Sequence, residues 1–524
     1  MRFTPAPHTT QNWHIEKPAA SGRRGMVVAQ SRNAAEAGVA VLDAGGNAID
    51  AAVATALALA AVEPWNSGLG GIGHAVVHRA GQAGAEVVDF GPTAPARLDA
   101  TRFKLTGRVA TDLFAWPEVE GDVNIHGPLS FVIPSAAAGY AEMHARWGRL
   151  PLAEIATPAI ALARRGLPQD WYTTLKVANS ASILRVYPES ARVYLRDGLP
   201  PVPPYQGALG YFRLGRLAET LERLAHAGWR DLYEGEIAAS IVADVAAMGG
   251  VLSAEDLRRC RARVAPASEG PWCAGTLQAS GPLTAAPTAM DVLRQMADVP
   301  FGPRPDAAWY VALARALKAA YAQRLAALGD AEPPAADSCT THLSVCDEEG
   351  TMVAMTATLL SSMGSRVVLP GTGILMNNGM MWFDPRPGQP NSMAPGKRPL
   401  TNMLPVILHD GGGQPRMAAG ASGGRRIMAA VLQLTAFAGG FGMTPAAAAH
   451  QPRIDVSDPH KVTADPRLDP DILRALQADG PTEVVDHGVL PINFACPNLV
   501  VQENGVRVGI SDAASPWSAA VAQA

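Results

Sequence analysis

The residues best suited to covalent chemistry lie near position 340, where the chain reads TTHLSV over 340–345 and TAT over 356–358. A threonine whose own α-amino group is free can use that amine as the base for its hydroxyl. An internal threonine has no such amine, so a cut between Cys339 and Thr340 would place nucleophile and base on one residue. The sequence therefore predicts a hidden N-terminus at Thr340.

Three neighbouring features strengthen this prediction, because a threonine pair at the start of a strand is common by itself. The preceding segment Ala331–Ser338 (AEPPAADS) is a polar, proline-bearing linker that would expose the Cys339–Thr340 bond. Thr358, on the next expected strand, can donate a hydrogen bond across the hairpin to the Thr340 hydroxyl. The glycines of Gly420–Arg426 (GASGGRR) open an expected helix, where adjacent N–H groups suit an oxyanion hole. A plain turn at the start of that helix is the alternative.

Other motifs favour structural roles. The run Gly68–Gly73 matches GxGxxG and Asp89 follows at a suitable distance, but a dinucleotide site needs strand, glycine loop and helix in that order. Here a helix precedes and a strand follows, so a glycine turn with close backbone packing is preferred. The twelve histidines show no HExxH and no Cys/His ligand spacing, which predicts no metal and no cofactor. His342, in an alternating strand, is interpreted as a hydrogen-bonded structural residue.

The bulk composition is that of an ordinary globular protein. The chain has 524 residues, 48% hydrophobic and 17% charged, with a net charge of −4. This balance gives no electrostatic case for nucleic acid or an anionic membrane as a partner. The first residues show no apolar run of the secretory type, and Ala48–Val62 is too short for a membrane span. With five scattered cysteines in no CxxC pair, these features predict a cytoplasmic protein with free thiols.

Periodicity and capping signals predict the main elements. Asn47 is expected to cap a helix over Ala48–Val62, and a helical region broken by Pro and Gly is expected from about Ser135 to Gly270. A hairpin is expected after the linker, with strands Thr341–Cys346 and Thr351–Thr358. Further helices are expected at Ala34–Ala44, Leu152–Arg165, Glu236–Met248, Ala307–Leu328, Arg425–Phe437, Pro445–His450 and Pro470–Asp479, and further strands at Gly25–Ala29, His74–His78, Glu86–Phe90, Pro405–His409, Asn498–Gln502 and Val506–Ile510. Antiparallel strands between helical regions predict stacked sheets covered by helices.

The ordered motifs resemble the γ-glutamyltransferase family of N-terminal-nucleophile hydrolases over nearly the whole chain. The matching pieces are GMVVAQS, GGNAIDAAVATALAL, GLGGIG, VVDFGPTAPA, WGRLPLAEIATPAIALARRG, LYEGEIAASIVADVAAMGGVLSAEDL, TTHLSV, PGKRPL and GASGGRRI. The resemblance implies an α+β fold, a four-layer αββα sandwich, made as a proenzyme and cut autocatalytically before Thr340. Residues 1–339 would form the large subunit and residues 340–524 the small subunit of one αββα domain.

The same resemblance implies roles for single residues. By motif position, Thr340 would be the nucleophile, Thr358 its hydrogen-bond partner, and Gly423 and Gly424 the oxyanion hole. The two subunits would form a heterodimer, or a dimer of heterodimers.

The chain departs from the glutathione-processing members where they grip the γ-glutamyl group. Their arginine after Asp-Phe is Gly91 here, and their asparagine two residues after the second threonine is Leu360. Their glutamine and aspartate in the Asn-Asn segment are Gly379 and Trp382. Because loss of a buried charged partner removes about 3–5 kcal/mol, glutathione is not the expected substrate.

The form NNGMMWFDPRPGQPNSMAPGKRPL resembles a cytoplasmic branch that includes oxamate amidohydrolases of purine breakdown and γ-glutamyltransferase-like acylases. The leading hypothesis is a self-processing amidohydrolase for a small amide, with oxamate, giving oxalate and ammonia, as the specific substrate. The oxamate carboxylate would face a cation, for which Arg398, Arg425 and Arg426 are candidates. Thr401 and Asn402 stand where the family has a Ser-Ser pair and would line the pocket.

Two other hypotheses stay open. One is a γ-glutamyltransferase, glutathione hydrolase or acylase with an altered substrate clamp. The other is an uncleaved, non-catalytic homologue that acts as a binding protein, although such a homologue has no physical reason to keep Thr340, Thr358, Gly423 and Gly424 together.

Overall fold

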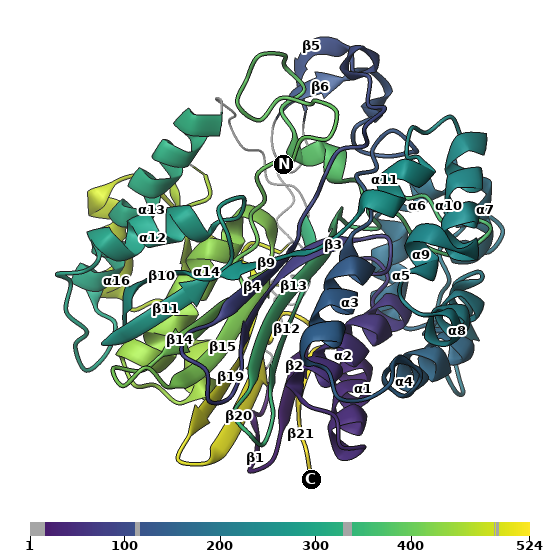
Figure 1. The fold of residues 1–524 in the computed structure, drawn as a ribbon. Helices are drawn as coiled ribbons and strands as arrows, with labels where there is room; N and C mark the ends of the chain where they lie inside the picture. The colour runs from purple at the N-terminus through teal and green to yellow at the C-terminus, as the bar shows by residue number, and fades with distance from the viewer. Residues whose placement is uncertain (1–15, 111–115, 329–337, 459, 487, 489–491) are drawn as a thin grey trace.

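Two stacked β-sheets form the centre of the molecule, and a layer of helices covers the outer face of each (Figure 1). The structure is a computed structural model that describes residues 16–110, 116–328, 338–458, 460–486, 488 and 492–524. This arrangement is the four-layer αββα sandwich that the sequence predicts.

Each sheet has seven antiparallel strands and contains strands from both sides of position 340. The first sheet runs in the order β1 (Ala20–Gly22), β20 (Val506–Ser511), β19 (Cys496–Glu503), β15 (Pro415–Ser422), β14 (Val406–His409), β11 (Gly275–Ala279) and β10 (Ser268–Trp272). The second runs in the order β21 (Ala519–Ala522), β2 (Met26–Ala29), β12 (Ser338–Cys346), β13 (Met352–Ser361), β3 (Ile72–His78), β4 (Glu86–Phe90) and β9 (Arg263–Pro266). The predicted nucleophile strand β12 therefore lies inside its sheet.

The helices divide between the two outer faces (Figure 1). The layer over the second sheet comprises α1 (Arg32–Asp43), α2 (Ala48–Val62), α3 (Ala136–Trp147), α4 (Leu152–Arg165), α5 (Trp171–Ala178), α6 (Ala181–Leu184), α7 (Pro188–Tyr194), α8 (Leu217–Ala227), α9 (Asp231–Glu234), α10 (Glu236–Ala247) and α11 (Ala254–Arg259). The layer over the first sheet comprises α12 (Ala286–Gln295), α13 (Ala307–Leu328), α14 (Ile427–Thr435), α15 (Pro445–His450) and α16 (Pro470–Asp479).

The side chains of β12 point alternately into two hydrophobic cores. Leu343 and Val345 pack in the core beneath the helices of the second sheet, whereas Cys346 packs between the sheets with Ile407 and Val500 of the first sheet. Successive side chains of a strand point to opposite faces, so one face of β12 meets the helix layer and the other meets the first sheet.

Helix α2 shows how the sequence fixes one of these layers. The Asn47 side chain accepts from the N–H groups of Ile49 and Asp50, and the Asp50 carboxylate accepts from Asn47 N, which completes a capping box. All fifteen residues of α2 are buried. Its alanine-rich surface lets α1, α3 and α4 and the strands of the second sheet approach closely, and the helix ends at the buried residue Glu63.

Most predicted elements are confirmed, several to the residue. The bounds of α2, α4, α13, α15, α16 and β4 equal the predicted ones, and the predicted hairpin is present as β12 and β13. Of the predicted linker, residues 331–337 lie outside the described residues, while Ser338 belongs to β12.

Two predictions about elements are wrong in part. The helical region does not reach Gly270, because β9 and the start of β10 occupy residues 263–270. Residues Gly420–Ser422 end the strand β15 instead of opening a helix, and the helical turn begins only at Gly424. Both segments have few β-branched residues, and pairing of β9 with β4 and of β15 with β19, which are remote in sequence, supports their strand conformation.

Candidate active site

The β-hairpin that carries Thr340 is irregular at that residue. Cys339 lies opposite Leu360 and Thr341 opposite Ala357, so the register shifts by one residue between these pairs. Two residues of β13, including Thr358, therefore oppose Thr340 alone, which is the arrangement of a β-bulge. A bulge interrupts the ladder and re-aims side chains, so contacts of side chains must hold Thr340 in place.

Thr358 is the closest such contact. Both hydroxyls are buried, and the Thr340 hydroxyl donates to Thr358 Oγ1 at 3.3 Å. The sequence predicted this contact between the two threonines, and the catalytic roles of both residues stay predictions. Thr358 Oγ1 also accepts from Leu360 N at 2.8 Å, and Leu360 has a φ of 88°, which non-glycine residues rarely adopt. The surrounding structure thus imposes an unusual backbone beside Thr358.

The glycine run before β3 packs directly against this bulge. A Cβ on Gly71 would lie 2.7 Å from Thr358 O, and a Cβ on Gly70 would lie 2.2 Å from Leu375 O. Helix α2 precedes the run and strand β3 follows it. These contacts confirm the interpretation of Gly68–Gly73 as a turn for close backbone packing.

The second glycine segment, after β15, approaches the same strand from the other sheet. Gly423 has a φ of 141° and Gly424 a φ of 59°, and a Cβ on Gly423 would lie 2.7 Å from Ala495 Cα. The turn Gly424–Arg426 contacts β12. Position 423 requires glycine, and the placement of the turn beside β12 agrees with the predicted oxyanion role, which stays a prediction.

His342 links the two sheets beneath the nucleophile. Its ring is fully buried and forms two hydrogen bonds. Nδ1 bonds with Thr356 Oγ1 at 2.9 Å, and Nε2 bonds with Ser344 Oγ at 3.1 Å. A Cβ on Gly420 would lie 2.3 Å from the His342 ring. The predicted hydrogen-bonded structural role of His342 is confirmed, and the ring leaves room for nothing larger than glycine at position 420.

Buried histidines predict a loss of stability in acid. Burial lowers the pKa of His342 to about 3, and it lowers the pKa values of His74 and His409 to about 4, from an ordinary value of 6.5. As pH falls below 6.5, these histidines take up protons in the unfolded chain but stay neutral in the folded protein. The free energy of unfolding should therefore fall as pH decreases from 6.5 toward 4. Glu63, whose pKa burial raises to about 7, acts in the opposite direction.

Urea unfolding of wild type and His342→Asn at several pH values would isolate the histidine contribution. We expect the urea midpoint to fall with acidification in wild type and to fall less steeply in His342→Asn. Equal slopes in the two proteins would contradict the assignment of a depressed pKa to His342.

Arg398 forms an ion pair with Asp89. Its guanidinium donates to both oxygens of Asp89, with Nη1–Oδ2 at 2.9 Å and Nη2–Oδ1 at 2.6 Å. Arg398 Nη2 also lies 2.7 Å from the position of a Cβ on Gly91. The guanidinium of Arg398 therefore stands beside the residue that replaces the arginine of the glutathione-processing relatives.

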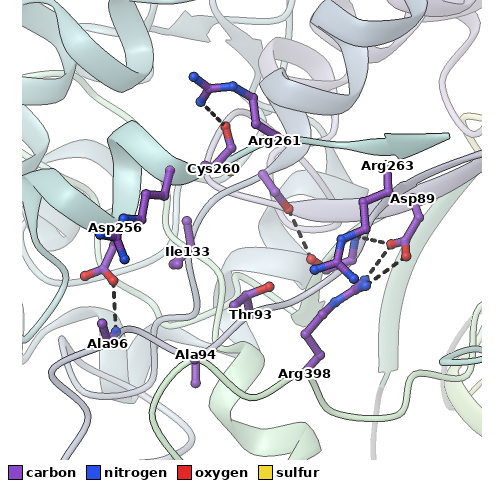
Figure 2. Close-up of a pocket in the computed structure, with 14 residues that line it drawn as sticks. Asp89, Thr93, Ala94, Ala96, Ile133, Asp256, Cys260, Arg261, Arg263 and Arg398 are labelled. Carbon is purple, nitrogen blue, oxygen red and sulfur yellow. Dashed lines mark hydrogen bonds and ion pairs between the residues drawn. The ribbon is translucent and has the colours of Figure 1, made fainter.

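A cavity of about 240 Å³ opens beside this ion pair (Figure 2). Figure 2 shows Arg263 and Arg398 extending into the same part of the cavity next to Asp89. Its charged lining consists of four arginines and two aspartates: Arg259, Arg261, Arg263, Arg398, Asp89 and Asp256. Arg398 pairs with Asp89, Arg259 with Glu255 and Arg261 with Glu234, and Arg263 adds a further positive charge, so the lining favours an anionic group.

Thr401 and Asn402 do not line this cavity. The Thr401 hydroxyl donates to Leu283 O at 3.0 Å and the residue is fully buried. Arg324 of α13 donates to Thr401 O (2.7 Å) and to Asn402 Oδ1 (3.2 Å). The pair that replaces the Ser-Ser of the family thus holds a buried arginine from another layer.

Arg425 and Arg426 follow the candidate oxyanion glycines directly. Arg425 O accepts a hydrogen bond from the Tyr321 hydroxyl, and Arg426 Nη1 donates to Ile492 O. Arg425 is the candidate cation nearest in sequence to Gly424. Its predicted contact with substrate stays a prediction.

The part of the chain that the structure describes holds neither a metal-binding cluster nor a membrane-spanning helix. No three His, Cys, Asp or Glu side chains lie close enough to share a metal ion in the residues that the structure describes. In the same residues no helix has the length and apolar character needed to cross a bilayer.

The geometry of the hairpin and the glycine turn agrees with a match to known proteins. The sequence profile of the family described as Gamma-glutamyltranspeptidase matches residues 34–339 and 331–521. The chain belongs to this family. Members of the γ-glutamyltranspeptidase family are hydrolases or transpeptidases, so the protein is an enzyme of that kind.

Characterised relatives of the γ-glutamyltranspeptidase family align over most of the chain. The "Acylase ACY 1 proenzyme" of Pseudomonas sp. (strain SE83) is 32% identical over 468 residues, which cover 82% of each chain. The "Glutathione hydrolase proenzyme" of Escherichia coli (strain K12) is 27% identical over 544 residues, which cover 94% of this chain and 90% of that protein. Both relatives are named as proenzymes.

A solved structure shows the same fold. The cephalosporin acylase from Bacillus halodurans superposes with a TM-score of 0.83 over 99% of both chains, at 24% identity. At this level of identity the likeness concerns the fold of the γ-glutamyltranspeptidase family and not the substrate.

The sequence analysis missed three polar residues of this region. Glu63 accepts a hydrogen bond from Thr341, Arg324 holds Asn402, and Arg263 lines the cavity. Glu63 gave one usable signal, since it is an acidic residue directly after an otherwise apolar helix. Arg324 and Arg263 lie among many ordinary arginines, and only the fold brings them to the site.

Proposed function

We propose that this enzyme is a self-processing amidohydrolase that is cut before Thr340 into a large subunit, 1–339, and a small subunit, 340–524. The observation that supports it best is the contact of Thr340 with Thr358 at a bulge that faces the glycine turn of the other sheet. The proenzyme names of two relatives support the cut. The subunits would stay together as a heterodimer, or as a dimer of heterodimers.

In the maturation step, the Thr340 hydroxyl attacks the Cys339 carbonyl carbon and the C–N bond breaks, which leaves an ester and a free α-amine. Water then cleaves the ester. In the hydrolytic step, the amine takes the hydroxyl proton while the oxygen attacks the amide carbonyl of the substrate. The Gly423 and Gly424 N–H groups stabilise the oxyanion, ammonia or an amine leaves, and water releases the acid from Thr340.

The specific substrate that we propose is oxamate, which would yield oxalate and ammonia. Its carboxylate needs a cation near Thr340. We propose Arg425 for this role, because it directly follows the oxyanion glycines. The unpaired state of the four described cysteines, Cys260, Cys273, Cys346 and Cys496, agrees with the cytoplasmic location that we propose for this reaction.

The first test is the intact mass of purified protein under denaturing conditions. Two chains, one ending at Cys339 and one starting at Thr340, are expected. A single uncut chain in fresh and aged samples would refute the proposal and favour the non-catalytic binding homologue. Ammonia release from oxamate by cut protein tests the substrate, and no release would remove oxamate while leaving the amidohydrolase in place.

A second candidate, an acylase for a longer anionic amide, is favoured by the cavity at Arg263. Sheet order places β4, beside the cavity, three strands from β12. At about 4.8 Å per strand, that is roughly 14 Å, farther than oxamate reaches. Release of amine from amides with a distal carboxylate, in cut protein inactive on oxamate, would select this candidate. Rapid turnover of a γ-glutamyl anilide would instead indicate a transferase with a rebuilt clamp.

Thr358→Val should slow both cleavage and turnover. Valine keeps the shape but removes the hydroxyl that contacts Thr340 and accepts from Leu360 N. Loss of such a hydrogen bond costs about 0.5–1.5 kcal/mol, so we expect rates lower by up to about tenfold. Thr358→Ser, which keeps the hydroxyl, serves as the control. Equal rates for Thr358→Val and wild type would contradict the predicted role of Thr358.

A further inference from the structure

The buried carboxyl group of Glu63 contacts Thr341, the residue next to the candidate nucleophile. Glu63 follows the last turn of α2 and is 1% exposed. Its Oε2 accepts a hydrogen bond from Thr341 Oγ1 at 2.9 Å, and burial raises the pKa of this carboxyl to about 7. A buried acid without an arginine partner is costly, and neither the proposed hydrolysis nor the oxyanion turn uses it.

The position of Thr341 gives this contact its importance. The strand ladder is interrupted at Thr340, so the backbone pairing of β12 does not fix that residue. Thr341 resumes the ladder opposite Ala357 and turns its side chain toward Glu63 and the helix layer. The conformation of Thr340 is therefore set between two side-chain contacts, Thr358 on one side and Thr341 with Glu63 on the other.

Polar contacts continue from Glu63 to the glycine turn. Asn66 lies beside the same carboxyl and donates to Gln30 Oε1 at 3.4 Å. Gln30 Nε2 in turn donates to Ser422 Oγ, directly before Gly423. The remaining charge near Glu63 is the ammonium of Lys176 on α5, which is also buried. Glu63 thus joins the neighbour of the nucleophile to the start of the candidate oxyanion turn.

We propose that Glu63 is a positioning residue that holds Thr340 through Thr341 and, once the chain is cut, controls the charge of the new α-amine. This proposal rests on the proposed cut before Thr340. Consecutive Cα atoms are about 3.8 Å apart, so the ionised carboxylate of Glu63 lies within Coulomb range of that amine. An adjacent negative charge favours the ammonium form and raises the pKa of an amine.

The direction of the effect follows from the charge. The α-amine must be neutral to act as the base, so the ionised Glu63 keeps it protonated up to higher pH. Glu63→Gln keeps the shape and the acceptor oxygen but removes the charge. We expect this variant to lower the pKa of the Thr340 amine by roughly half a pH unit or more.

Acetylation by acetic anhydride measures this amine without any substrate. The mass of the proteolytic peptide that begins at Thr340 reports modification of this amine separately from Lys397 and Lys461, and its pH dependence gives the midpoint. The matched control is Asp50→Asn, which removes another buried carboxylate at the opposite end of α2. A lower midpoint in Glu63→Gln and an unchanged one in Asp50→Asn support the proposal. Equal midpoints in wild type and Glu63→Gln overturn it.

The positioning role is tested by the rate of chain cleavage after cell-free synthesis. Thr341→Val removes the hydroxyl that Glu63 accepts from, and we expect cleavage at least roughly tenfold slower. Thr341→Ser should cleave at nearly the wild-type rate. Thr220, whose buried hydroxyl donates to Thr372 O at 2.6 Å, gives the matched control Thr220→Val. Equal cleavage by Thr341→Val and Thr220→Val would overturn the role.

A thermodynamic cycle in the Thr340→Ala background covers the case of poor folding or absent cleavage. Thr341→Val should shift the urea midpoint clearly less when Glu63→Ala has already removed the acceptor. Additive shifts would overturn the proposal. If wild type is never cut, the proposed function fails by itself, whereas the cycle still reports on the Glu63–Thr341 contact.

Discussion

Replacement of Thr340 by alanine is expected to leave the chain uncut and to remove amidase activity. The variant keeps the fold but lacks both the hydroxyl and, without a cut, the free amine. Loss of a catalytic nucleophile lowers turnover on the order of 10⁴–10⁶-fold. Intact mass should show one chain, and ammonia release from the amide that wild type hydrolyses should equal the blank.

Thr340→Ser is the matched control, because serine keeps a hydroxyl at the same place. We expect this variant to cut itself more slowly than wild type and to retain measurable hydrolysis. Two chains in Thr340→Ala, with the small one beginning at residue 340, would show that a protease makes the cut. Full activity of the uncut chain would refute the nucleophile assignment altogether.

Gly420→Ala should be among the most damaging substitutions outside the hydroxyl pair. The new Cβ would lie 2.3 Å from the buried His342 ring, which is held by Thr356 and Ser344. Overpacking of this kind costs about 1–3 kcal/mol, and more where the neighbour cannot move. Since the two sheets meet at this contact, β15 and its glycine turn should also move away from β12 and slow cleavage.

The urea midpoint and the fraction of cut chain measure both effects. Gly281→Ala is the control, because a Cβ there would meet no heavy atom within 4 Å. A wild-type midpoint for Gly420→Ala would show that the sheets are farther apart than the structure places them. Lower stability with normal cleavage would separate the packing of His342 from the geometry of the turn.

Local signals in the sequence predict the helices well and the sheets less well. Asn47, with Asp50 three residues later, marks the start of α2 correctly, and period and capping likewise place α13 and α16. Strand β15 reads PRMAAGAS, which has no branched residue, and becomes a strand because β14 and β19 flank it. β14 is its hairpin neighbour, but β19 is remote in sequence, and a single sequence does not reveal such a partner.

The candidate site divides in the same way. Thr358 was predictable because a short hairpin places it opposite Thr340, and the glycine turn was predictable from its composition. The contact of Glu63 with Thr341 across 278 positions was not predictable, because helix α2 must pack on the sheet that holds β12 before the two residues meet. Nor does the sequence reveal that Arg398 is bound to Asp89, 309 positions away.

The strand order has a consequence for the product of cleavage. Each sheet combines strands from before and after position 340, and β2 near the N-terminus lies between β12 and the C-terminal strand β21. A cut at Thr340 would therefore yield two polypeptides that share both β-sheets, rather than two separately folded subunits in contact. They could part only by unfolding both sheets, so neither could be exchanged, diluted away or replaced in a mature molecule. Maturation would be irreversible, and the enzyme could not be regulated by dissociation of its subunits.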